Sequence, residues 1–365
     1  MVLDDAGENP KKIVVVGGGR TGEAILDLLT KDTRFDPYVL ETDYDRLRFL
    51  RDLGYVGEQI SGTETLELKS VLKDATAVIC AAPPSVSPRV ANAAKEAGCH
   101  YIDLCEDAAA VGKVVALAAD SDLYFVPGCG LAPGLVSTLT DQMVRAATQQ
   151  AEITAYVGVL PATKTNRLGF GDLWNIDGLM AEYTNPCRAL VAGEIVAEPA
   201  LQQLEELTIA GTEYEAFSTS GGLDDLVKHY RGTVQALSFK TIRYPGHLDY
   251  IRFLLDDLKL SDRLYLLRNL LLNGLTKGEE DKVVIRITDR NTENSRELNL
   301  VFRAKPLSGG RYRSAVANVS AHHVCAVLDI LTSGLAPHGG VLHHSDLTLE
   351  ILNQSRYSEL FSSSE

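Results

Sequence analysis

Three glycines near the amino-terminal end of the chain, Gly17, Gly19 and Gly22, follow the spacing G-x-G-x-x-G. A run of β-branched residues, 13–16, precedes them, and a segment with helical patterning follows. In such a turn the first glycine permits a tight bend, the second lets backbone N–H groups approach a pyrophosphate, and the third allows close packing of helix on strand. The helix N-terminus attracts phosphate through its partial positive charge. The pattern therefore predicts a dinucleotide-binding turn, and its context argues against a glycine turn without a ligand.

An acidic residue, Glu41, ends the next expected strand, about 20 residues after Gly22. A carboxylate there accepts hydrogen bonds from the ribose hydroxyls and repels a 2′-phosphate, so it favours NAD over NADP. Arg20 and Arg46 keep NADP open, because an arginine near the ribose can hold the extra phosphate. Asp43 is an alternative ribose ligand, although its place before a helical segment favours a capping role.

Small residues, Ala81-Ala82-Pro83-Pro84, follow the fourth expected strand. They would let the nicotinamide ribose lie against the sheet edge, or they form an ordinary proline turn. The residues expected to contact the dinucleotide are Gly17, Gly19, Arg20, Thr21, Gly22, Glu41, Ala81, Ala82, Pro83 and Gly130.

Up to about residue 130, short apolar strands alternate with helical segments. This alternation predicts a doubly wound, parallel α/β sheet with right-handed crossovers. The strands are expected over 12–16, 38–41, 55–59, 77–81, 101–103 and 123–127. The helices are expected over 21–31, 44–53, 65–72, 87–97 and 107–120.

After Pro133-Gly134 the pattern changes to longer alternating strands separated by polar turns, which predicts an α+β domain with a largely antiparallel sheet. A helix is expected over 134–147, and strands over 152–160, 208–217, 237–244, 282–289 and 299–303. Towards the carboxyl-terminal end, residues 315–332 predict an amphipathic helix and residues 348–352 a short one.

Composition excludes some classes of function. The formal net charge of −14 and the absence of a basic run longer than Lys11-Lys12 argue against a nucleic-acid partner. Residues 1–12 lack the apolar core of a signal peptide, and no stretch is expected to span a membrane. The six cysteines form no CxxC pair, so we expect reduced thiols and a cytoplasmic protein. The doublets His322-His323 and His343-His344 do not have metal-ligand spacing, and we expect no metal.

Four further stretches carry a family resemblance: GCGLAPGL at 128–135, YVGVLP at 156–161, EYTNP at 182–186 and TIRYPGHL at 241–248. In their order and spacing the chain resembles the saccharopine dehydrogenase-like family, and most closely the lysine 6-dehydrogenases. It departs from the family at Ala317-Asn318, where a Thr-Gly pair is common, and at His322-His323, where small or apolar residues are expected. Ser61 also stands where relatives often have an aspartate.

The resemblance implies a Rossmann domain over 1–130, an inserted α+β substrate and dimerisation domain over 131–310, and a carboxyl-terminal segment, 311–365, that returns to the Rossmann domain. It implies a homodimer. It also implies NAD-dependent oxidative deamination of L-lysine at its terminal carbon. Hydride passes to NAD, and the resulting imine is hydrolysed to ammonia and allysine, which cyclises to piperideine-6-carboxylate.

Such a reaction needs a base, a cation for the substrate carboxylate and an activated water. Arg243 is the expected carboxylate ligand, since it ends a strand before the Pro245-Gly246 turn; the alternative is a strand-end ion pair. His247, in the same turn, is a candidate acid or base, or else a histidine bonded to backbone.

Asp103 ends the fifth expected strand, where side chains face the cofactor crevice, and it is a candidate for deprotonating or holding the ammonium. Glu182 is expected to bind the distal amine and Tyr183 to donate a hydrogen bond, with packing as the alternative. Trp174 is expected to be a lid or a loop anchor. Cys129 lies between two glycines, and we expect no thiolate chemistry there.

The leading hypothesis from the sequence is thus an NAD(P)-dependent oxidoreductase that acts on CH–NH₂ groups, with L-lysine as substrate. A saccharopine-type enzyme, which joins or splits an amino acid and a carbonyl acid, is the second hypothesis. A dinucleotide sensor without catalysis is the third, because a fold does not imply a function.

Overall fold

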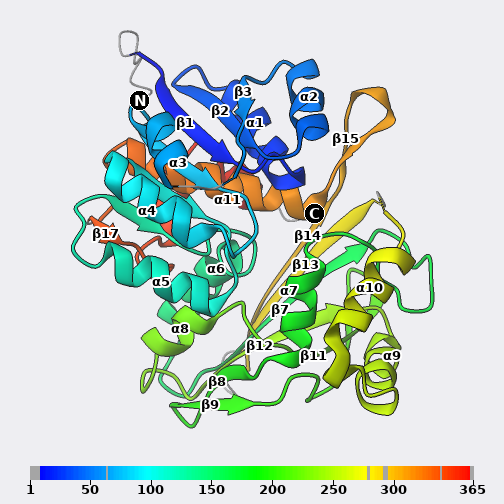
Figure 1. Ribbon diagram of the computed structural model, residues 1–365. Helices are drawn as coiled ribbons and strands as arrows, with labels where there is room; N and C mark the ends of the chain where they lie inside the picture. Colours follow the sequence, from blue (N-terminus) through cyan, green and yellow to red (C-terminus); the bar gives the residue numbers. More distant parts are fainter. Residues whose placement is uncertain (1–8, 63–64, 278–279, 291–294, 338, 362–365) are drawn as a thin grey trace. The chain divides into compact units, whose positions relative to one another are not determined.

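The computed structural model describes residues 9–62, 65–277, 280–290, 295–337 and 339–361 (Figure 1). The chain forms two compact units. The first unit comprises Met1–Gly130 and Ser320–Ser358, and the second comprises Leu131–Val319 and Glu359–Glu365. Residues 1–8, on which the expectation about targeting partly rests, lie outside the described residues.

The first unit is built on a parallel sheet with the strand order β17-β6-β5-β4-β1-β2-β3. Its strands are β1 (Lys11–Val16), β2 (Phe35–Glu41), β3 (Gly57–Gln59), β4 (Ala77–Cys80), β5 (His100–Asp103), β6 (Tyr124–Val126) and β17 (Gly340–Val341). Its helices between strands are α1 (Arg20–Thr30), α2 (Tyr44–Asp52), α3 (Thr65–Leu72), α4 (Ser87–Ala97) and α5 (Ala108–Ala118). The expected Rossmann-type α/β fold is confirmed.

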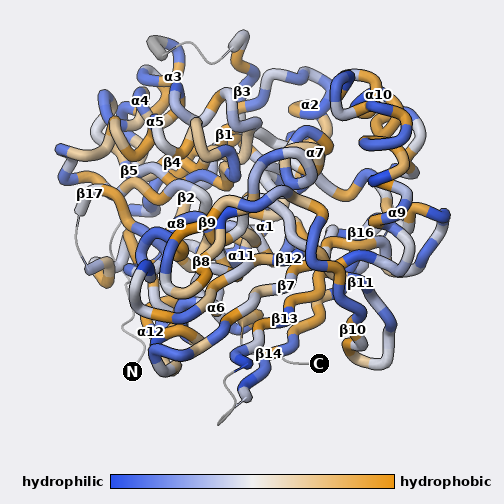
Figure 2. The backbone as a smooth tube through the Cα atoms, turned by 90° about the horizontal axis from the view of Figure 1, so that it is seen from below, coloured by the Kyte–Doolittle hydropathy of each residue, from blue (hydrophilic) through white to orange (hydrophobic). Residues whose placement is uncertain are grey.

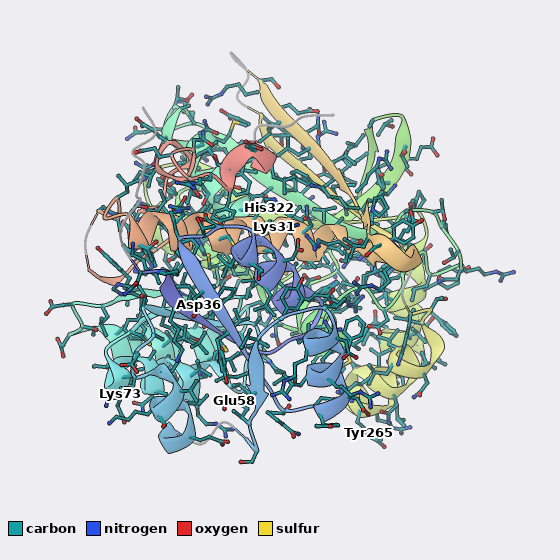
Figure 3. The ribbon with its side chains drawn as sticks, turned by 90° about the horizontal axis from the view of Figure 1, so that it is seen from above. Lys31, Asp36, Glu58, Lys73, Tyr265 and His322 are labelled. Carbon is teal, nitrogen blue, oxygen red and sulfur yellow. The ribbon has the colours of Figure 1, made fainter. Side chains whose placement is uncertain are left out.

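The centre of this sheet explains why its strands could be recognised. Strand β1 lies between β2 and β4, and residues 13–16 are fully or almost fully buried. Strand β4 is likewise buried along its length. A strand covered on both faces selects a continuous apolar run rather than an alternating one, which is what both segments contain. Charged side chains such as Lys31, Asp36 and Lys73 lie at the outside of this unit (Figure 3).

The carboxyl-terminal segment supplies β17, which pairs in parallel with β6 and was not predicted from the sequence, because two residues show no periodicity. It also supplies most of helix α11 (Ala315–Thr332) and all of helix α12 (Leu349–Leu352), with the 3₁₀ turn η4 (Ser358–Phe361) at its end. The expected return of these helices to the Rossmann unit is confirmed.

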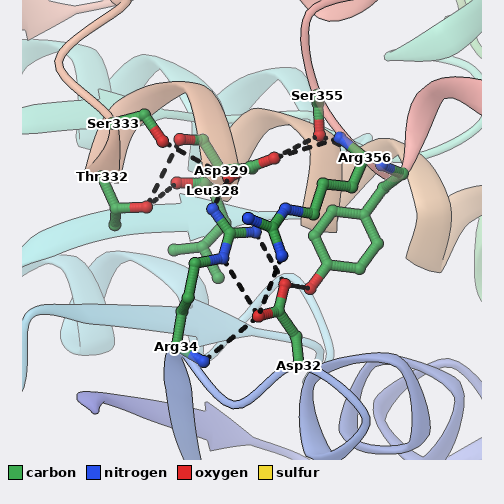
Figure 4. A network of polar contacts seen from close by, with 9 residues as sticks. Asp32, Arg34, Leu328, Asp329, Thr332, Ser333, Ser355 and Arg356 are labelled. Carbon is green, nitrogen blue, oxygen red and sulfur yellow. Dashed lines mark hydrogen bonds and ion pairs between the residues drawn. The ribbon is translucent and has the colours of Figure 1, made fainter. Parts of the chain in front are cut away.

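An ion-pair network fastens this segment to the loop before β2 (Figure 4). Arg34 donates to Asp329 of α11 at 2.7 Å and to Asp32 at 2.6 Å. Ser355 donates to the other oxygen of Asp329 at 2.8 Å, and Tyr357 donates to Asp32 at 2.9 Å. Two aspartates and one arginine therefore join three parts of the chain that lie far apart in the sequence.

Helix α11 differs from its expectation. The sequence predicted an amphipathic helix, whereas α11 is buried on nearly all sides. By length and composition alone it could cross a membrane, but 83% of it is buried inside the protein. The difference has a simple cause: a helix in a protein core can bury polar residues such as Asn318 and Asp329 together with its apolar ones, so its burial does not follow from one apolar face.

The second unit contains a mixed sheet with the order β10-β11-β12-β7-β13-β14, to which β8 and then β9 attach beside β12. The β7–β12 pair is parallel and the other pairs are antiparallel. Its strands are β7 (Glu152–Pro161), β8 (Cys187–Val191), β9 (Glu194–Glu198), β10 (Glu205–Ile209), β11 (Thr212–Ser218), β12 (Ala236–Arg243), β13 (Asp281–Asp289) and β14 (Arg296–Arg303), with the small pair β15 (Lys305–Pro306) and β16 (Tyr312–Arg313).

Helices also occupy this unit, so the expectation that polar turns separate its strands was wrong. They are α6 (Leu135–Arg145), α7 (Ile176–Thr184), α8 (Asp224–His229), α9 (His247–Arg252) and α10 (Leu264–Gly274), with the short turns η1 (Phe253–Asp257), η2 (Leu260–Arg263) and η3 (Ser308–Gly310). Only α6 was predicted. Helix α10 (LYLLRNLLLNG) carries six leucines, of which Leu267 and Leu271 are buried, and its tube in Figure 2 shows both hydrophobic and hydrophilic stretches.

The strand expected over 208–217 is a hairpin of β10 and β11. Ala210 and Gly211 form its two-residue turn, both at positive φ, 48° and 74°. Such a turn matches the twist of the two strands. Alanine is uncommon at positive φ, so the sequence reads as one continuous strand at this point.

Candidate active site

The glycine turn of the first unit joins β1 to α1 and has little free space on two sides. A Cβ atom on Gly22 would lie 2.0 Å from the carbonyl oxygen of Gly17, and a Cβ on Gly17 would lie 2.8 Å from that of Ala81. A Cβ on Gly19 would meet nothing within 4 Å. Gly22 thus permits close helix packing, and Gly19 leaves the N-terminus of α1 open to a phosphate, so the residues present fit a dinucleotide.

Glu41 is held beside this turn by backbone N–H groups. One carboxylate oxygen accepts from Gly18 N–H at 2.7 Å, and the other accepts from Thr42 N–H at 2.7 Å and Asp43 N–H at 3.0 Å. Asp43 itself caps α2 by accepting from Arg46 N–H, as expected. A carboxylate fixed next to the glycine turn suits the ribose hydroxyls of NAD.

Arg46 is engaged by the same turn. Its guanidinium donates to Gly18 O at 2.5 Å and pairs with Glu23 at 2.7 Å. Arg20 lies exposed at the start of α1, with Thr21 beside it. Ala81 joins the turn by donating to Val16 O, and Ala82 and Pro83 lead on towards α4. The cofactor residues expected around β1, β2 and β4 therefore come together in one region.

Asp103, at the end of β5, is fully buried and accepts three hydrogen bonds. The donors are the Tyr101 hydroxyl at 2.6 Å, Gly128 N–H at 2.8 Å and Cys105 N–H at 2.9 Å. Burial raises the pKa of this carboxyl, while the three donors oppose that shift. These contacts favour a holding function, in which Asp103 anchors the segment that leads to Gly130, over proton transfer.

Cys129 lies in that segment, with its Sγ atom 3.5 Å from Nδ1 of His323. Burial raises the pKa of the thiol well above its ordinary value and lowers the pKa of His323 to about 3. The pair is therefore neutral near pH 7, which agrees with the expectation of no thiolate chemistry. Within the described part of the chain, no group of three or more His, Cys, Asp or Glu side chains could hold a metal ion. His322, the residue before His323, lies on α11 (Figure 3).

Arg243, the last residue of β12, is the central charge of a polar cluster in the second unit. Only 2% of it is exposed. Its Nε donates to the Tyr183 hydroxyl at 2.9 Å and one terminal nitrogen donates to Ile242 O at 3.0 Å. Its ion pair with Glu182 is 3.4 Å long, and the ring of Phe170 lies 5.1 Å from the guanidinium carbon. Since a charge-assisted bond is normally about 2.7–2.9 Å long, the pair leaves this buried cation incompletely compensated.

His247 and Tyr183 extend the cluster as a chain of hydrogen bonds. The Nδ1 atom of His247 lies 2.8 Å from Leu168 O, and a carbonyl only accepts, so Nδ1 carries the proton. The Nε2 atom therefore accepts from the Tyr183 hydroxyl at 2.9 Å. Burial, and then the charge of Arg243, lower the pKa of His247 to about 3. A neutral, fully bonded imidazole holds Tyr183 in place, and this geometry does not favour the expected acid or base function.

Glu182 is the member of the cluster that titrates near neutrality. Its side chain is about one-fifth exposed, at 20%. Burial raises the pKa of the carboxyl to about 7, and the charge of Arg243 acts in the opposite direction. Burial also raises the pKa of Tyr183 to about 12, so the phenol stays protonated.

Local structure explains why these side chains meet. Asn175 caps α7 by accepting from Asp177 N–H, and the last turn of α7 presents Glu182 and Tyr183. The turn after β12 bends at Gly246, which has φ of 91°, and α9 begins at His247. The ring of Phe217 on β11 stacks on His247 with an interplanar angle of 14°.

Sequence reasoning missed one buried acid beside this cluster. Glu215 of β11 is 7% exposed and accepts from Gly246 N–H and Leu248 N–H. The available signal was a charged residue between Tyr214 and Ala216 in a strand. Trp174 packs, partly buried, against the apolar cluster that includes Phe170, which favours the anchor interpretation over the lid.

A glycine-turn Rossmann unit with a carboxylate beside it, followed by an α/β unit with a buried arginine–glutamate pair, defines the class of dinucleotide-dependent oxidoreductases. Comparison with family models gives the family. Residues 13–131 match the saccharopine dehydrogenase NADP binding domain, and residues 130–354 match the saccharopine dehydrogenase C-terminal domain. The chain belongs to the saccharopine dehydrogenase family, and it is an NAD(P)-dependent oxidoreductase.

One solved structure shares the fold, and two others are similar to a lesser degree. Apo saccharopine dehydrogenase (L-Glu forming) from Saccharomyces cerevisiae is 15% identical with a TM-score of 0.75, over 94% of this chain and 95% of that one. GenD2 from gentamicin A biosynthesis, in complex with NAD, is 14% identical with a TM-score of 0.47, over 98% and 97%. A probable dehydrogenase from Thermotoga maritima is 12% identical with a TM-score of 0.48, over 96% and 99%.

Proposed function

We propose that this protein is an NAD-dependent dehydrogenase that oxidatively deaminates an amino acid at its terminal amine, with L-lysine as the substrate. The observation that carries the proposal is the buried Arg243 with Glu182 beside it at 3.4 Å. A guanidinium is suited to a carboxylate, and a neighbouring carboxylate is suited to an ammonium. Together they match the α-carbon of an amino acid, which bears both groups.

This pairing changes the function proposed for Glu182. The sequence assigned it to the distal amine, but four methylene groups separate the ε-nitrogen of lysine from its α-carbon. Because Glu182 lies directly against Arg243, it suits the α-ammonium when Arg243 holds the α-carboxylate. The distal amine would then extend away from this pair, and neither Asp103 nor His247 has the contacts expected of its proton acceptor.

In the proposed reaction the terminal carbon loses a hydride and its nitrogen loses a proton, and water then replaces the nitrogen. The products are an aldehyde, an ammonium ion, a reduced dinucleotide and a proton. The dinucleotide, when bound, supplies the hydride acceptor. The contribution of the chain in the second unit is binding and orientation: Arg243 and Glu182 hold the α-carbon, and Tyr183 fixes the plane of the guanidinium.

The test is a substrate comparison with purified protein between pH 7 and 10, in which the absorbance of NADH is followed. We expect turnover of L-lysine and much weaker turnover of two amines that each lack one recognised group: 6-aminohexanoate, which lacks the α-amine, and cadaverine, which keeps both amines but lacks the carboxylate. NADP replaces NAD in a parallel series. The absence of reduced dinucleotide with L-lysine throughout this range would sink the lysine proposal.

A second candidate, a saccharopine-type reaction, is favoured by the names of both matched family models. Saccharopine with NAD or NADP is therefore an arm of the same experiment. Turnover of saccharopine but not of L-lysine would support this second candidate. Tight dinucleotide binding without turnover of any substrate would support the third hypothesis, a dinucleotide sensor without catalysis.

A further inference from the structure

We propose that Glu215 is a positioning residue, which holds the turn over 244–248 so that Arg243 and His247 take their places in the amino-acid site. This inference rests on the proposed function, since it concerns the same cluster. Nothing in the pattern of the sequence assigned Glu215 a function. Its carboxylate contacts the backbone on both sides of His247.

The register of the sheet places Glu215 beside the site. Strand β11 runs antiparallel to β12, and Glu215 lies directly opposite Arg243. From there its carboxylate reaches across the end of β12. One oxygen accepts from Gly246 N–H at 2.8 Å and the other accepts from Leu248 N–H at 2.6 Å.

These two hydrogen bonds supply acceptors for N–H groups that the turn itself leaves without a side-chain cap. Gly246 precedes α9 without a side-chain cap of its own, and it adopts a left-handed φ of 91°. A carboxylate is an acceptor at both oxygens, so one side chain satisfies two N–H groups that flank His247. Burial makes both bonds matter, because an unsatisfied N–H group in a protein interior costs free energy.

The consequence passes along the hydrogen-bond chain. If the turn shifts, His247 moves relative to Leu168 O and the Tyr183 hydroxyl. Tyr183 then loses the acceptor that orients it, and Arg243 loses a fixed partner for its Nε. A residue needed only for stability would not alter recognition of the amino acid, whereas a positioning residue would.

The first test compares Glu215→Gln with Glu213→Gln, an exposed glutamate two residues away on the same strand. Glutamine matches the shape of Glu215 but turns an NH₂ donor towards one of the two N–H groups. For E215Q we expect KM for the amino acid to rise roughly 10- to 100-fold, because small misplacements of binding groups have effects of this size. The dissociation constant for the dinucleotide should stay unchanged in E215Q. In E213Q, KM for the amino acid should also stay unchanged.

A second measurement does not depend on turnover. In ¹⁵N NMR spectra, the ring of His247 in the wild-type protein should show one neutral tautomer with the proton on Nδ1, down to a pH near its pKa of about 3. In E215Q we expect mixed tautomers, because the turn that carries the ring is no longer held by two hydrogen bonds. The His247→Asn variant assigns the signal.

The outcomes separate the two proposals. If the wild-type protein oxidises no amino acid, the proposed function fails. The comparison of the His247 tautomer between the wild-type protein and E215Q still tests the positioning function of Glu215. If E215Q does not fold, Glu215→Asp replaces it, because the shorter acid can reach only one of the N–H groups. An unchanged KM together with an unchanged His247 spectrum, in whichever variant folds, would overturn the positioning proposal.

Discussion

Arg243 carries a permanent positive charge almost out of contact with water, and the structure compensates it only in part. Two aromatic rings and one carboxylate at 3.4 Å surround it. A buried charge is costly unless it is paired closely. The arrangement is therefore suited to a protein whose cation acquires its best partner when a carboxylate binds.

Replacing Arg243 by lysine should separate recognition from cofactor binding. Lysine keeps the charge but cannot form the planar fork or donate to Tyr183 from Nε. We expect kcat/KM for L-lysine to fall by about two orders of magnitude or more, which corresponds to losing charge-assisted bonds. Dinucleotide affinity, measured by calorimetry, should not change. Arg263→Lys, an exposed site on η2, is the matched control.

Glu182 should give the activity a pH dependence near neutrality. Its pKa is raised to about 7, so the carboxylate is protonated below that pH and charged above it. Only the charged form attracts an ammonium, and kcat/KM should therefore rise with pH through about 7. The Glu182→Gln variant should lose this limb of the profile. If kcat/KM of E182Q still rises with pH near 7, the pH dependence belongs to another group.

Glu41 should govern the choice of dinucleotide. Its carboxylate is fixed beside the glycine turn by three N–H groups, where it would repel a 2′-phosphate. Glu41→Gln keeps the shape and removes the charge. We expect the preference for NAD over NADP to shrink by roughly tenfold or more, as one lost charge-assisted contact implies. Glu58→Gln on β3 is the control, and an unchanged NAD/NADP ratio of affinities in E41Q would contradict the prediction.

At the scale of elements, the network of Asp329, Arg34 and Ser355 joins α11 and the carboxyl-terminal residues to the loop before β2, in addition to the pairing of β17 with β6 (Figure 4). Asp329→Asn removes one charge from a mostly buried pair. We expect the free energy of unfolding of this unit to fall by about 2 kcal/mol, less than for a fully buried pair because Arg34 is partly exposed. Urea unfolding measures it, with Asp120→Asn, an exposed acid, as the control.

The elements differ in how far the sequence predicts them. In the first unit, β1 and α1 follow from local signals: a continuous apolar run, a glycine turn and a helical period. In the second unit, α7 and α9 were missed although they carry Tyr183 and His247. Short helices with mixed polarity depend on tertiary packing more than on their own periodicity, and packing is not visible in a single sequence.

For the whole molecule, we propose a homodimer. The second unit exposes several large apolar side chains between η1 and α10, namely Phe253 (48%), Leu258 (49%), Tyr265 (65%) and Leu270 (52%). Apolar residues gathered in one region favour association between proteins. Light scattering should give twice the chain mass of 39.6 kDa. Tyr265→Ser with Leu270→Ser should lower this mass, whereas Leu335→Ser in the first unit should not.

The sequence by itself determined the Rossmann unit, the position of its glycine turn and the acid at Glu41, because each has a local signature: a continuous apolar run, the glycine spacing, and an acid at the end of the next strand. It also determined that Arg243 ends a strand. Only the tertiary structure decided that Glu182 lies against Arg243 and that Glu215 holds the following turn. These residues belong to α7, β11 and β12, and their meeting depends on strand register and helix packing, which no local pattern encodes.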